Sequence, residues 1–346
     1  MILPRRIVIL AEGQFSHHHS KTANGAIRFI PEQVVAVIDS TKAGKTTQEV
    51  IGAGGEIPVV ASLKESLPFT PNALLIGIAP PGGVLPDNFK SVIREAIIHR
   101  MDVLNGLHTF ISDDPEMVVL SKQQGVQIID YRRPPKNLHI ATMRWKERKA
   151  KVVLTVGIDA NIGKKTTALV LCKDFQTRGY KADFIATGQT GMLISGGGIS
   201  VDAVPADFVS GAIEDLVMES AQKHDVIFVE GQGSLVHQGY SAVATGILHG
   251  AMPDAMIMSL EVNRQVCDNG TPYPDIKKVI QLHEDMVTIY RPTKVVGISI
   301  ITYGLDDKAA WEVIRITERE TGLSTTDPLR FSTVKLGDAI IKYLNL

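Results

Sequence analysis

Two short segments of the chain each contain a Gly-Lys pair followed by two threonines: STKAGKTT, residues 40–47, and GIDANIGKKTT, residues 157–167. Such a composition is typical of a phosphate-binding loop, in which backbone N–H groups surround the anion and the next helix adds its positive dipole end. The chemistry that these residues can do is therefore the binding of a phosphorylated ligand. Because the helix is part of such a site, the residues after each Gly-Lys pair decide which segment binds phosphate.

The second segment is followed by a strong helix pattern. After Lys164, apolar residues recur at the i, i+3, i+4 and i+7 spacing of one helix face, and the pattern ends at Gly179. These apolar residues are Ala168, Leu171, Cys172 and Phe175. After Lys45, only TTQEVI precedes GAGGEIP, which leaves less than two turns and no apolar face. We therefore predict that residues 157–167 bind phosphate and that residues 40–47 form a turn.

The predicted loop departs from the G-x-x-x-x-G-K-[ST] pattern in two ways. It has one extra residue before its Gly-Lys pair, and Lys165 stands where the magnesium-binding hydroxyl normally comes. Thr166 or Thr167 would have to supply that hydroxyl. An ordinary strand-turn-helix is the alternative interpretation. The candidate residues for binding phosphate or nucleotide are Gly157, Asp159, Asn161, Gly163, Lys164, Lys165, Thr166 and Thr167.

An acidic residue follows a later strand pattern. The stretch VIFVEGQGS, residues 226–234, indicates a buried strand that ends in Glu230. P-loop folds place a carboxylate there to bind magnesium directly or through water, so Thr166 and Glu230 form the predicted magnesium site. A glutamate that only caps the strand is the alternative. Glu230 and His237 are the candidate catalytic residues, because histidine moves protons near neutral pH, although a structural histidine fits the sequence equally well.

Three further polar residues lie at predicted carboxyl ends of strands or in adjoining loops, where open α/β sheets bind ligands. The predicted substrate-binding residues are Arg264, Asp327 and Arg330. Arginine is the natural partner of a substrate carboxylate, and surface ion pairing is the alternative for each residue. Asp202 and Asp207, which follow a glycine-rich stretch, are secondary carboxylate candidates.

The elements that must position these residues are short apolar strands alternating with helices, which predicts parallel sheets covered by helices. Strands are predicted in the first half near residues 7–10, 34–39 and 73–79, and in the second half near 151–158, 225–231, 255–261 and 294–302. Residues 130–150 contain two prolines and a basic cluster without apolar periodicity and are the predicted linker. We predict an α/β protein with two doubly wound parallel-sheet domains, a Rossmann-like domain over residues 1–147 and a P-loop NTPase-like domain over 148–346.

Composition limits the function classes. The chain of 346 residues has 36 basic and 37 acidic residues, so no general attraction to nucleic acid or to an anionic membrane is expected. Two cysteines and the absence of a secretory signal pattern favour the cytoplasm. Residues 231–253 lack Asp, Glu, Lys and Arg, but their glycines and polar residues indicate loop and helix instead of a membrane span. A small-molecule substrate and a homo-oligomer are expected.

The loop and the glutamate strand resemble one branch of the P-loop proteins. The spacing of residues 157–167, with Asp159 inside the loop, is similar to that of dethiobiotin synthetases, and so is the sequence VEGQG after the strand. That resemblance implies an enzyme that binds ATP and magnesium.

Motifs along almost the whole chain resemble a family long labelled only as a domain of unknown function. They include AEG, VIDS, GGEIPVV, YRRPP, VGIDANIGKKTT, ATGQTG, VEGQGSLVH, LHGAMPDA and TGLSTTDPLRF. The family has a Rossmann-like N-terminal half and a P-loop C-terminal half, and one branch is described as D-glutamate N-acetyltransferases that use acetyl-coenzyme A.

The resemblance implies an acyl transfer in which the P-loop holds a phosphate of acetyl-coenzyme A. Arg264 or Arg330 would hold the carboxylate of a D-glutamate-like amino acid, and Glu230 or His237 would remove the proton from its amine. An ATP- and magnesium-dependent ligase and a nucleotide-binding regulatory protein are the alternatives.

Overall fold

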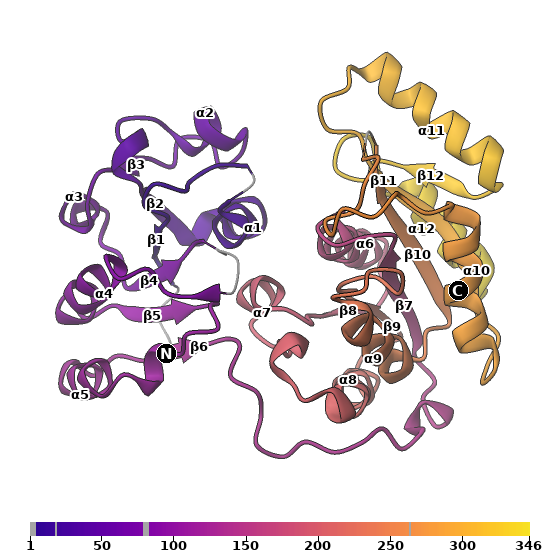
Figure 1. Ribbon diagram of the computed structural model, residues 1–346, viewed down its shortest axis with the longest axis horizontal. Helices are drawn as coiled ribbons and strands as arrows, with labels where there is room; N and C mark the ends of the chain where they lie inside the picture. The colour runs from indigo at the N-terminus through magenta and orange to yellow at the C-terminus, as the bar shows by residue number, and fades with distance from the viewer. Residues whose placement is uncertain (1–4, 18, 79–82, 263) are drawn as a thin grey trace. The chain divides into compact units, whose positions relative to one another are not determined.

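The fold is described from a computed structural model of the chain, over residues 5–17, 19–78, 83–262 and 264–346 (Figure 1). The chain forms two compact units, each built around one six-stranded sheet. The first unit comprises Met1–Pro134 and Gln189–Ala203, and the second comprises Pro135–Gly188 and Val204–Leu346. Neighbouring strands in both sheets pair in parallel. The predicted α/β class with two parallel sheets is confirmed.

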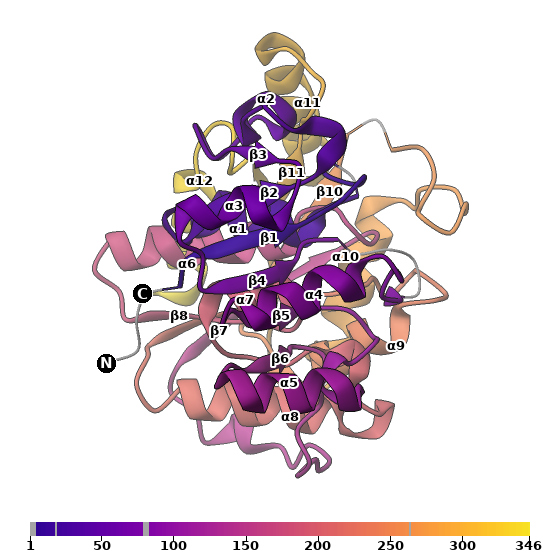
Figure 2. The same ribbon diagram turned by 90° about the vertical axis from the view of Figure 1, so that its left-hand side faces the viewer.

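The first sheet has the strand order β3-β2-β1-β4-β5-β6. Its strands are β1 (Ile7–Leu10), β2 (Val34–Ile38), β3 (Val59–Val60), β4 (Ala73–Ile76), β5 (Asp102–Asn105) and β6 (Ile128–Asp130). The helices between them are α1 (Lys21–Phe29), α2 (Thr47–Ile51), α3 (Leu63–Ser66), α4 (Phe89–Ile98) and α5 (Pro115–Gln124), of which α4 and α5 lie side by side (Figure 2). Strand β4 ends before the predicted residue 79, which lies outside the described residues.

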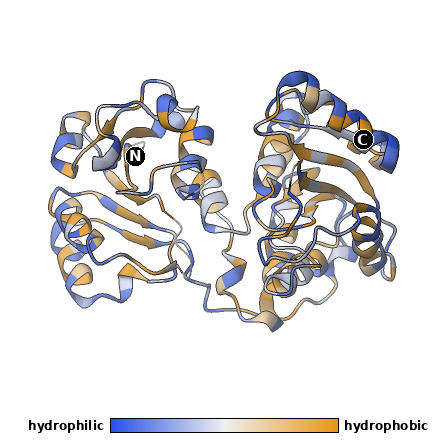
Figure 3. Ribbon diagram, turned by 45° about the horizontal axis from the view of Figure 1, so that its top comes forward, coloured by the Kyte–Doolittle hydropathy of each residue, from blue (hydrophilic) through white to orange (hydrophobic). Residues whose placement is uncertain are grey.

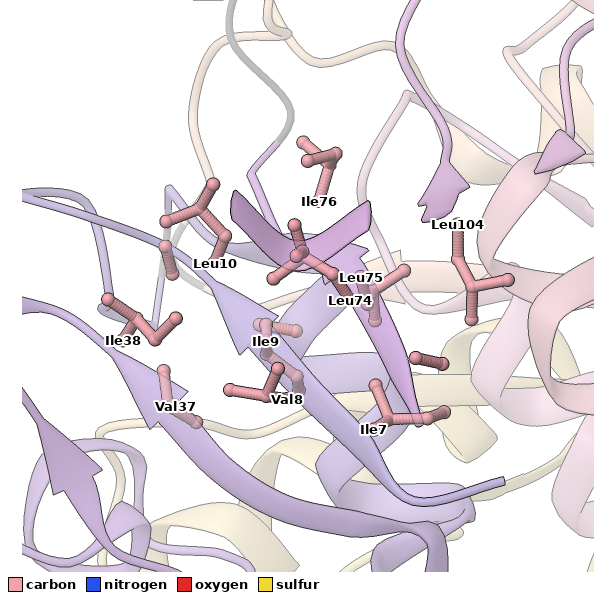
Figure 4. Packing of buried hydrophobic residues seen from close by; sticks show 14 of the residues in the cluster. Ile7, Val8, Ile9, Leu10, Val37, Ile38, Leu74, Leu75, Ile76 and Leu104 are labelled. Carbon is pink, nitrogen blue, oxygen red and sulfur yellow. The ribbon is translucent and has the colours of Figure 1, made fainter. Parts of the chain in front are cut away.

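The central strands of the first sheet are apolar along their whole length because helices cover both of their faces. All four residues of β1 and all four of β4 are buried, and Figure 4 shows their side chains packed with those of β2 and β5. In Figure 3 the strands of both sheets are coloured as hydrophobic, whereas the helices carry both kinds of residue. The continuous apolar runs in the sequence therefore correspond to the buried strands.

A segment from the middle of the chain belongs to the first unit. Helix α7 (Gln189–Ser195) packs against α1, and its Leu193 is part of the first hydrophobic core. Arg132 forms an ion pair with Asp202 of the same segment. The units therefore differ from the predicted domains 1–147 and 148–346: the chain changes unit at Pro134/Pro135, inside the predicted linker range, and residues 189–203 return to the first unit.

The second sheet has the order β12-β11-β10-β7-β9-β8. Its strands are β7 (Lys151–Gly157), β8 (Ala182–Ile185), β9 (Val226–Val229), β10 (Ala255–Glu261), β11 (Val295–Ile301) and β12 (Ser324–Thr326). The helices are α6 (Lys164–Thr177), α8 (Ala206–Ser220), α9 (Ser241–Ala251), α10 (Ile276–Thr288), α11 (Asp307–Thr321) and α12 (Val334–Leu344). Strand β7 lies between β9 and β10, so the loop after β7 opens at the centre of the carboxyl edge, where open α/β sheets bind ligands.

The uncharged stretch 231–253 is a loop followed by α9, as the sequence indicates. Among the helices that the structure describes, none has the length and apolar character needed to cross a membrane.

Candidate functional site

The loop between β7 and α6 folds back over the first residue of the helix. Gly163 caps α6 with φ of 91°, a left-handed conformation that favours glycine. Lys164, the first helical residue, is buried, and its Nζ donates to the carbonyl oxygen of Asp159 at 2.5 Å. Burial lowers the pKa of Lys164 to about 8, an effect that the charge of Asp159 opposes. The lysine is still mainly charged at neutral pH and lies beneath the loop.

Two glycines make room for the side chain of Lys164. A Cβ atom added to Gly157 would lie 3.3 Å from the Cδ of Lys164 and 2.7 Å from the Cδ1 of Ile162. A Cβ added to Gly231 would lie 3.3 Å from the same Cδ and 1.7 Å from the carbonyl oxygen of Thr155. The aliphatic part of Lys164 thus lies next to the end of β7 and to the residues that follow β9, and Gly231 lets these strands approach each other.

Asp159 anchors the loop from within. Its carboxylate is fully buried and accepts the Ala160 N–H at 2.7 Å, the Asp268 N–H at 2.9 Å and the Arg264 guanidinium at 2.7 Å. Asn161, which has a positive φ of 59°, donates to the Asp268 carboxylate at 2.8 Å. The loop is therefore fixed to the segment after β10 by charged and backbone hydrogen bonds.

Arg264 is surrounded by carboxylates of the protein. Besides Asp159, its guanidinium pairs with Glu261 at 2.8 Å and with Asp268 at 3.1 Å. It also donates to the carbonyl oxygen of Ala160 at 3.1 Å. This arrangement speaks against the predicted contact between Arg264 and a substrate carboxylate, because three protein carboxylates already surround its guanidinium group. Its observed place is that of an anchor for the loop.

Glu230 follows β9 directly and is buried. Its Oε2 accepts the N–H of Thr187 at 2.9 Å. Burial raises the pKa of Glu230 to about 7, and the charges of Lys165 and Lys164 and the N–H groups of Thr187 and Gly188 oppose that rise. The carboxyl group can therefore take up or release a proton near neutral pH, which a glutamate in water would not do.

The two threonines of the loop have different surroundings. The hydroxyl of Thr167 is buried and lies 2.7 Å from the hydroxyl of Ser299 on β11, so it faces the sheet. Ser259 of β10 is in register with Ser299 and with Gly157, and its buried hydroxyl has no partner among the described residues. Thr167 is thus part of a layer of hydroxyls beneath α6, which speaks against its predicted contact with phosphate. Thr166 is only half-buried.

His237 lies in the loop between β9 and α9. Ser234 ties this loop to the loop after β7 through a 2.7 Å bond to the carbonyl oxygen of Ile158. The imidazole is buried and stacks on Tyr240, and its Nδ1 accepts the N–H of Gly239 at 3.2 Å. Because Nδ1 accepts, the proton of a neutral ring is on Nε2. Nε2 is buried and has no partner among the described residues, so it is a donor available to a ligand or a water molecule.

A second buried histidine, His283 on α10, was missed by the sequence reasoning. Its Nδ1 bonds the carbonyl oxygen of Val279 at 2.7 Å, and burial lowers its pKa to about 4, so the ring is neutral. The ring lines a cavity of about 10 Å³, close to the least space that holds one water molecule, together with residues after β7 and β9 that include Gly157, Gly231 and Ser234. Spacing could have found it, because Val279, His283 and Val287 recur on one helix face.

Asp327 and Arg330 are brought together at the ends of β11 and β12. The Asp327 carboxylate accepts the N–H and the hydroxyl of Thr302 at 3.0 and 2.8 Å. Arg330 donates to the carbonyl oxygen of Thr302 at 3.2 Å and pairs with the exposed Asp307 at 2.6 Å. Ile301, the residue before Thr302, lies beside Gly163: a Cβ atom added to Gly163 would lie 3.1 Å from the Cδ1 of Ile301. The pair is thus connected along β11 to the loop that caps α6.

The segment STKAGKTT forms the predicted turn. Residues Ser40–Lys42 make one 3₁₀ turn, and the helix that follows, α2, has five residues with Thr46 and Glu49 as a capping box. Both carboxylate oxygens of Asp39, which precedes the turn, are used within the unit by Phe15, Thr41 and Lys42. The helix is too short to make a strong anion site.

Comparison with known proteins places both halves of the chain. A family described as a domain of unknown function, DUF1611_N, Rossmann-like domain, matches residues 40–134, and one described as DUF1611_C, P-loop domain, matches residues 139–337. A crystal structure of a DUF1611 family protein from Anabaena variabilis superposes with a TM-score of 0.94 at 36% identity, covering 98% of this chain and 99% of that one.

Two relatives with curated names are similar over most of their length. A Pseudoalteromonas protein named D-glutamate N-acetyltransferase is 36% identical over 273 residues, 78% of this chain and 81% of the relative. A Tritonibacter scottomollicae protein with the same name is 36% identical over 284 residues, 81% of this chain and 84% of the relative.

Proposed function

The chain belongs to the DUF1611 family, and from this premise we propose that it is an N-acetyltransferase that moves an acetyl group from acetyl-coenzyme A to the amine of a D-amino acid resembling D-glutamate. The observation that carries the proposal is the 36% identity, over about four fifths of the chain, with two proteins named for that activity. The geometry of the second unit supports it, because a cationic loop and a carboxyl group with a pKa near 7 lie at one edge of the sheet.

The loop of residues 157–167 is the proposed site for a phosphate of the donor. Coenzyme A carries several phosphates, and the N–H groups of the first turn of α6 together with the helix dipole favour an anion at the loop. Lys164 and Lys165 add two positive charges at the first two helical positions. In this proposal the loop residues hold the donor. The thioester of the donor reaches the acceptor along the carboxyl edge of the second sheet.

Glu230 is the proposed general base. The amine nitrogen of the acceptor must lose a proton and form a bond to the thioester carbon. The carbon–sulfur bond then breaks, and coenzyme A leaves. The proton from the amine goes to the carboxylate of Glu230, which then gives it to the leaving thiolate, so that the thiol forms and the base is ionised again. A base with a pKa of about 7 is half ionised at neutral pH and is a stronger proton acceptor than an ordinary glutamate.

His237 has the opposite role in the proposal. Because Nδ1 of His237 accepts the N–H of Gly239, Nε2 of the neutral ring carries the proton and has no lone pair with which to act as a base. An Nε2–H donor suits the developing negative charge on the thioester oxygen or on the leaving sulfur. The structure therefore supports Glu230 as the base, and His237 as a donor, over the reverse assignment.

Arg330 is the proposed partner of the acceptor's carboxylate. Its ion pair with Asp307 joins an exposed carboxylate, and such pairs contribute little to stability, so a substrate can replace it. Arg264 has no such freedom, since its guanidinium contacts the fully buried Asp159. Asp327 positions Arg330 through Thr302 and the Arg330 N–H.

The test is a thiol-release assay with the purified full chain, acetyl-coenzyme A and a panel of D- and L-amino acids that includes both glutamates. Thiol release that requires a D-amino acid, with the N-acetylated product seen by mass spectrometry, is the expected result. No release above the rate without acceptor would overturn the proposal.

ATP-dependent ligation remains the alternative because the loop belongs to the P-loop class. In that reaction the loop holds the β- and γ-phosphates of ATP, and Thr166 and Glu230 hold magnesium. ADP release that depends on a carboxylate substrate, without thiol release from acetyl-coenzyme A, would select it. Nucleotide binding without turnover in either assay would select a regulatory protein.

A further inference from the structure

We propose that Lys165, together with Lys164, neutralises the donor phosphate at this loop in place of a magnesium ion, so that donor binding and acyl transfer do not require a divalent cation. The inference rests on the proposed function and specifies how its loop recognises the donor. Magnesium is the ion that P-loop sites generally use, and it needs a hydroxyl after the loop lysine and a carboxylate at the end of a neighbouring strand.

The position that normally supplies the metal-binding hydroxyl is occupied by an ammonium group. Lys165 is the second residue of α6, directly after the loop lysine. Its charge is the largest of the influences that oppose the effect of burial on the pKa of Glu230. A cation placed between the loop and Glu230 would therefore meet positive charges from both Lys164 and Lys165.

Neither threonine of the loop replaces the missing hydroxyl. The Thr167 hydroxyl is buried under the helix and bonded to Ser299 at 2.7 Å. Thr166 is one residue beyond Lys165, and successive side chains on an α-helix differ in direction by about 100°. Thr166 thus cannot point where the side chain of Lys165 points.

The remaining magnesium ligand of the prediction, Glu230, already uses one of its two oxygens within the protein. Its Oε2 accepts the Thr187 N–H at 2.9 Å, and the carboxyl group is buried. The magnesium ion does not fit this residue set, whereas an anion does.

The cationic side chains have the properties that an anion needs. An ammonium group is a compact charge with three donors, and it binds phosphate as a point charge. Lys164 is held beneath the loop by the Asp159 carbonyl, and Lys165 is half-buried on the adjoining helical position. Two lysines and the N–H groups of α6 can balance the charge of a phosphate without a metal.

The experiment measures binding of acetyl-coenzyme A to the full chain by titration calorimetry, in buffer with EDTA and in buffer with magnesium. The dissociation constant is expected to be the same in both. Lys165→Ser restores the hydroxyl of the common pattern and is expected to weaken binding in EDTA by roughly tenfold or more, the scale of one charge-assisted hydrogen bond. Magnesium should restore part of that affinity in the variant only.

Two controls separate the local effect from general ones. Lys173→Ser removes an exposed lysine from the same helix and is expected to bind like the original chain. Thermal melting of each variant checks that the fold is retained. If a variant melts early, Lys165→Arg, which keeps the charge, is used to repeat the comparison and should keep its affinity in EDTA.

The outcomes distinguish this inference from the proposed function. Binding that is lost in EDTA and restored by magnesium in the original chain would overturn the inference and leave the acetyltransferase standing. Unchanged affinity of Lys165→Ser in EDTA would also overturn it. A chain that binds no acetyl-coenzyme A in either buffer would overturn the proposed function itself.

Discussion

The ammonium group of Lys164 lies 2.5 Å from the carbonyl oxygen of Asp159, which belongs to the same loop. The loop thus holds its own lysine before any ligand arrives. A phosphate that enters must compete with this carbonyl for the ammonium, and it gains a cation that is already positioned.

Lys164→Ala tests whether this lysine binds the donor. The variant should lose at least about tenfold in affinity for acetyl-coenzyme A, because a buried charge-assisted contact is removed. Calorimetry measures the change. The matched control is Lys45→Ala, which removes the exposed lysine of the other Gly-Lys pair and should leave the affinity unchanged. Equal losses in the two variants would contradict the assignment of the phosphate site.

Glu230 predicts the pH dependence of the reaction. A general base works only when ionised, so kcat/KM should fall as the pH drops through about 7. In Glu230→Gln, the rate at pH 8 should fall by about 10²–10⁴-fold, and the acidic limb near pH 7 should disappear. Initial rates of thiol release between pH 5 and 9 measure both. An unchanged limb in the variant would assign the titration to another group.

The same residue predicts a change in stability with pH. The folded pKa of about 7 is above the ordinary value of 4.5, so the stability that this proton contributes is complete below pH 4.5 and is lost as the pH rises through 7. Glu230→Gln carries no charge at either pH. Its melting temperature should therefore rise relative to that of the original chain between pH 5 and pH 8.5. A constant difference would contradict the raised pKa.

Arg264→Met should destabilise the fold. The variant leaves the fully buried Asp159 carboxylate without its cation, and breaking a buried ion pair costs about 3–5 kcal/mol. Urea denaturation measures the free energy of unfolding. Arg315→Met, which breaks an exposed pair with Glu312, should cost less than about 1 kcal/mol. Adding Asp159→Asn to Arg264→Met should recover part of the loss, and strict additivity of the two changes would contradict the pairing.

Gly231→Ala should disturb the site without removing any functional group. Its Cβ would lie 1.7 Å from the carbonyl oxygen of Thr155, so the ends of β7 and β9 would have to separate. We expect a loss of about 1–3 kcal/mol in the free energy of unfolding and weaker donor binding. Gly197→Ala is the control, because its Cβ would meet nothing within 4 Å. If Gly231→Ala changed neither the free energy of unfolding nor donor binding, the close approach of β7 and β9 at Gly231 would not matter for the site.

The features that depend on local sequence could be predicted. The apolar spacing after Lys164 predicted α6, and the lack of such spacing after Lys45 predicted a turn in place of a second site. The continuous apolar runs predicted the central strands, because buried parallel strands need apolar residues on both faces.

The features that depend on partners distant in the sequence could not be predicted. Arg264 has the residue type of a substrate ligand, but its buried partner Asp159 is known only once β7 and β10 are paired. Thr167 has the spacing of a metal ligand, but Ser299 on β11 takes its hydroxyl. His283 can be placed on the apolar face of α10 from its spacing, but its position beside the cavity is known only once α10 is packed.

The return of residues 189–203 to the first unit affects the order in which the protein can be completed during translation. A ribosome makes the N-terminal half first, and the strands of the first sheet can pair as they emerge. Helix α7, whose Leu193 fills part of that unit's core, is made only after residues 135–188. A gene fragment that stops at Pro134 would therefore encode a first half with an unfilled core, and one that starts at Pro135 would carry a helix without its packing surface.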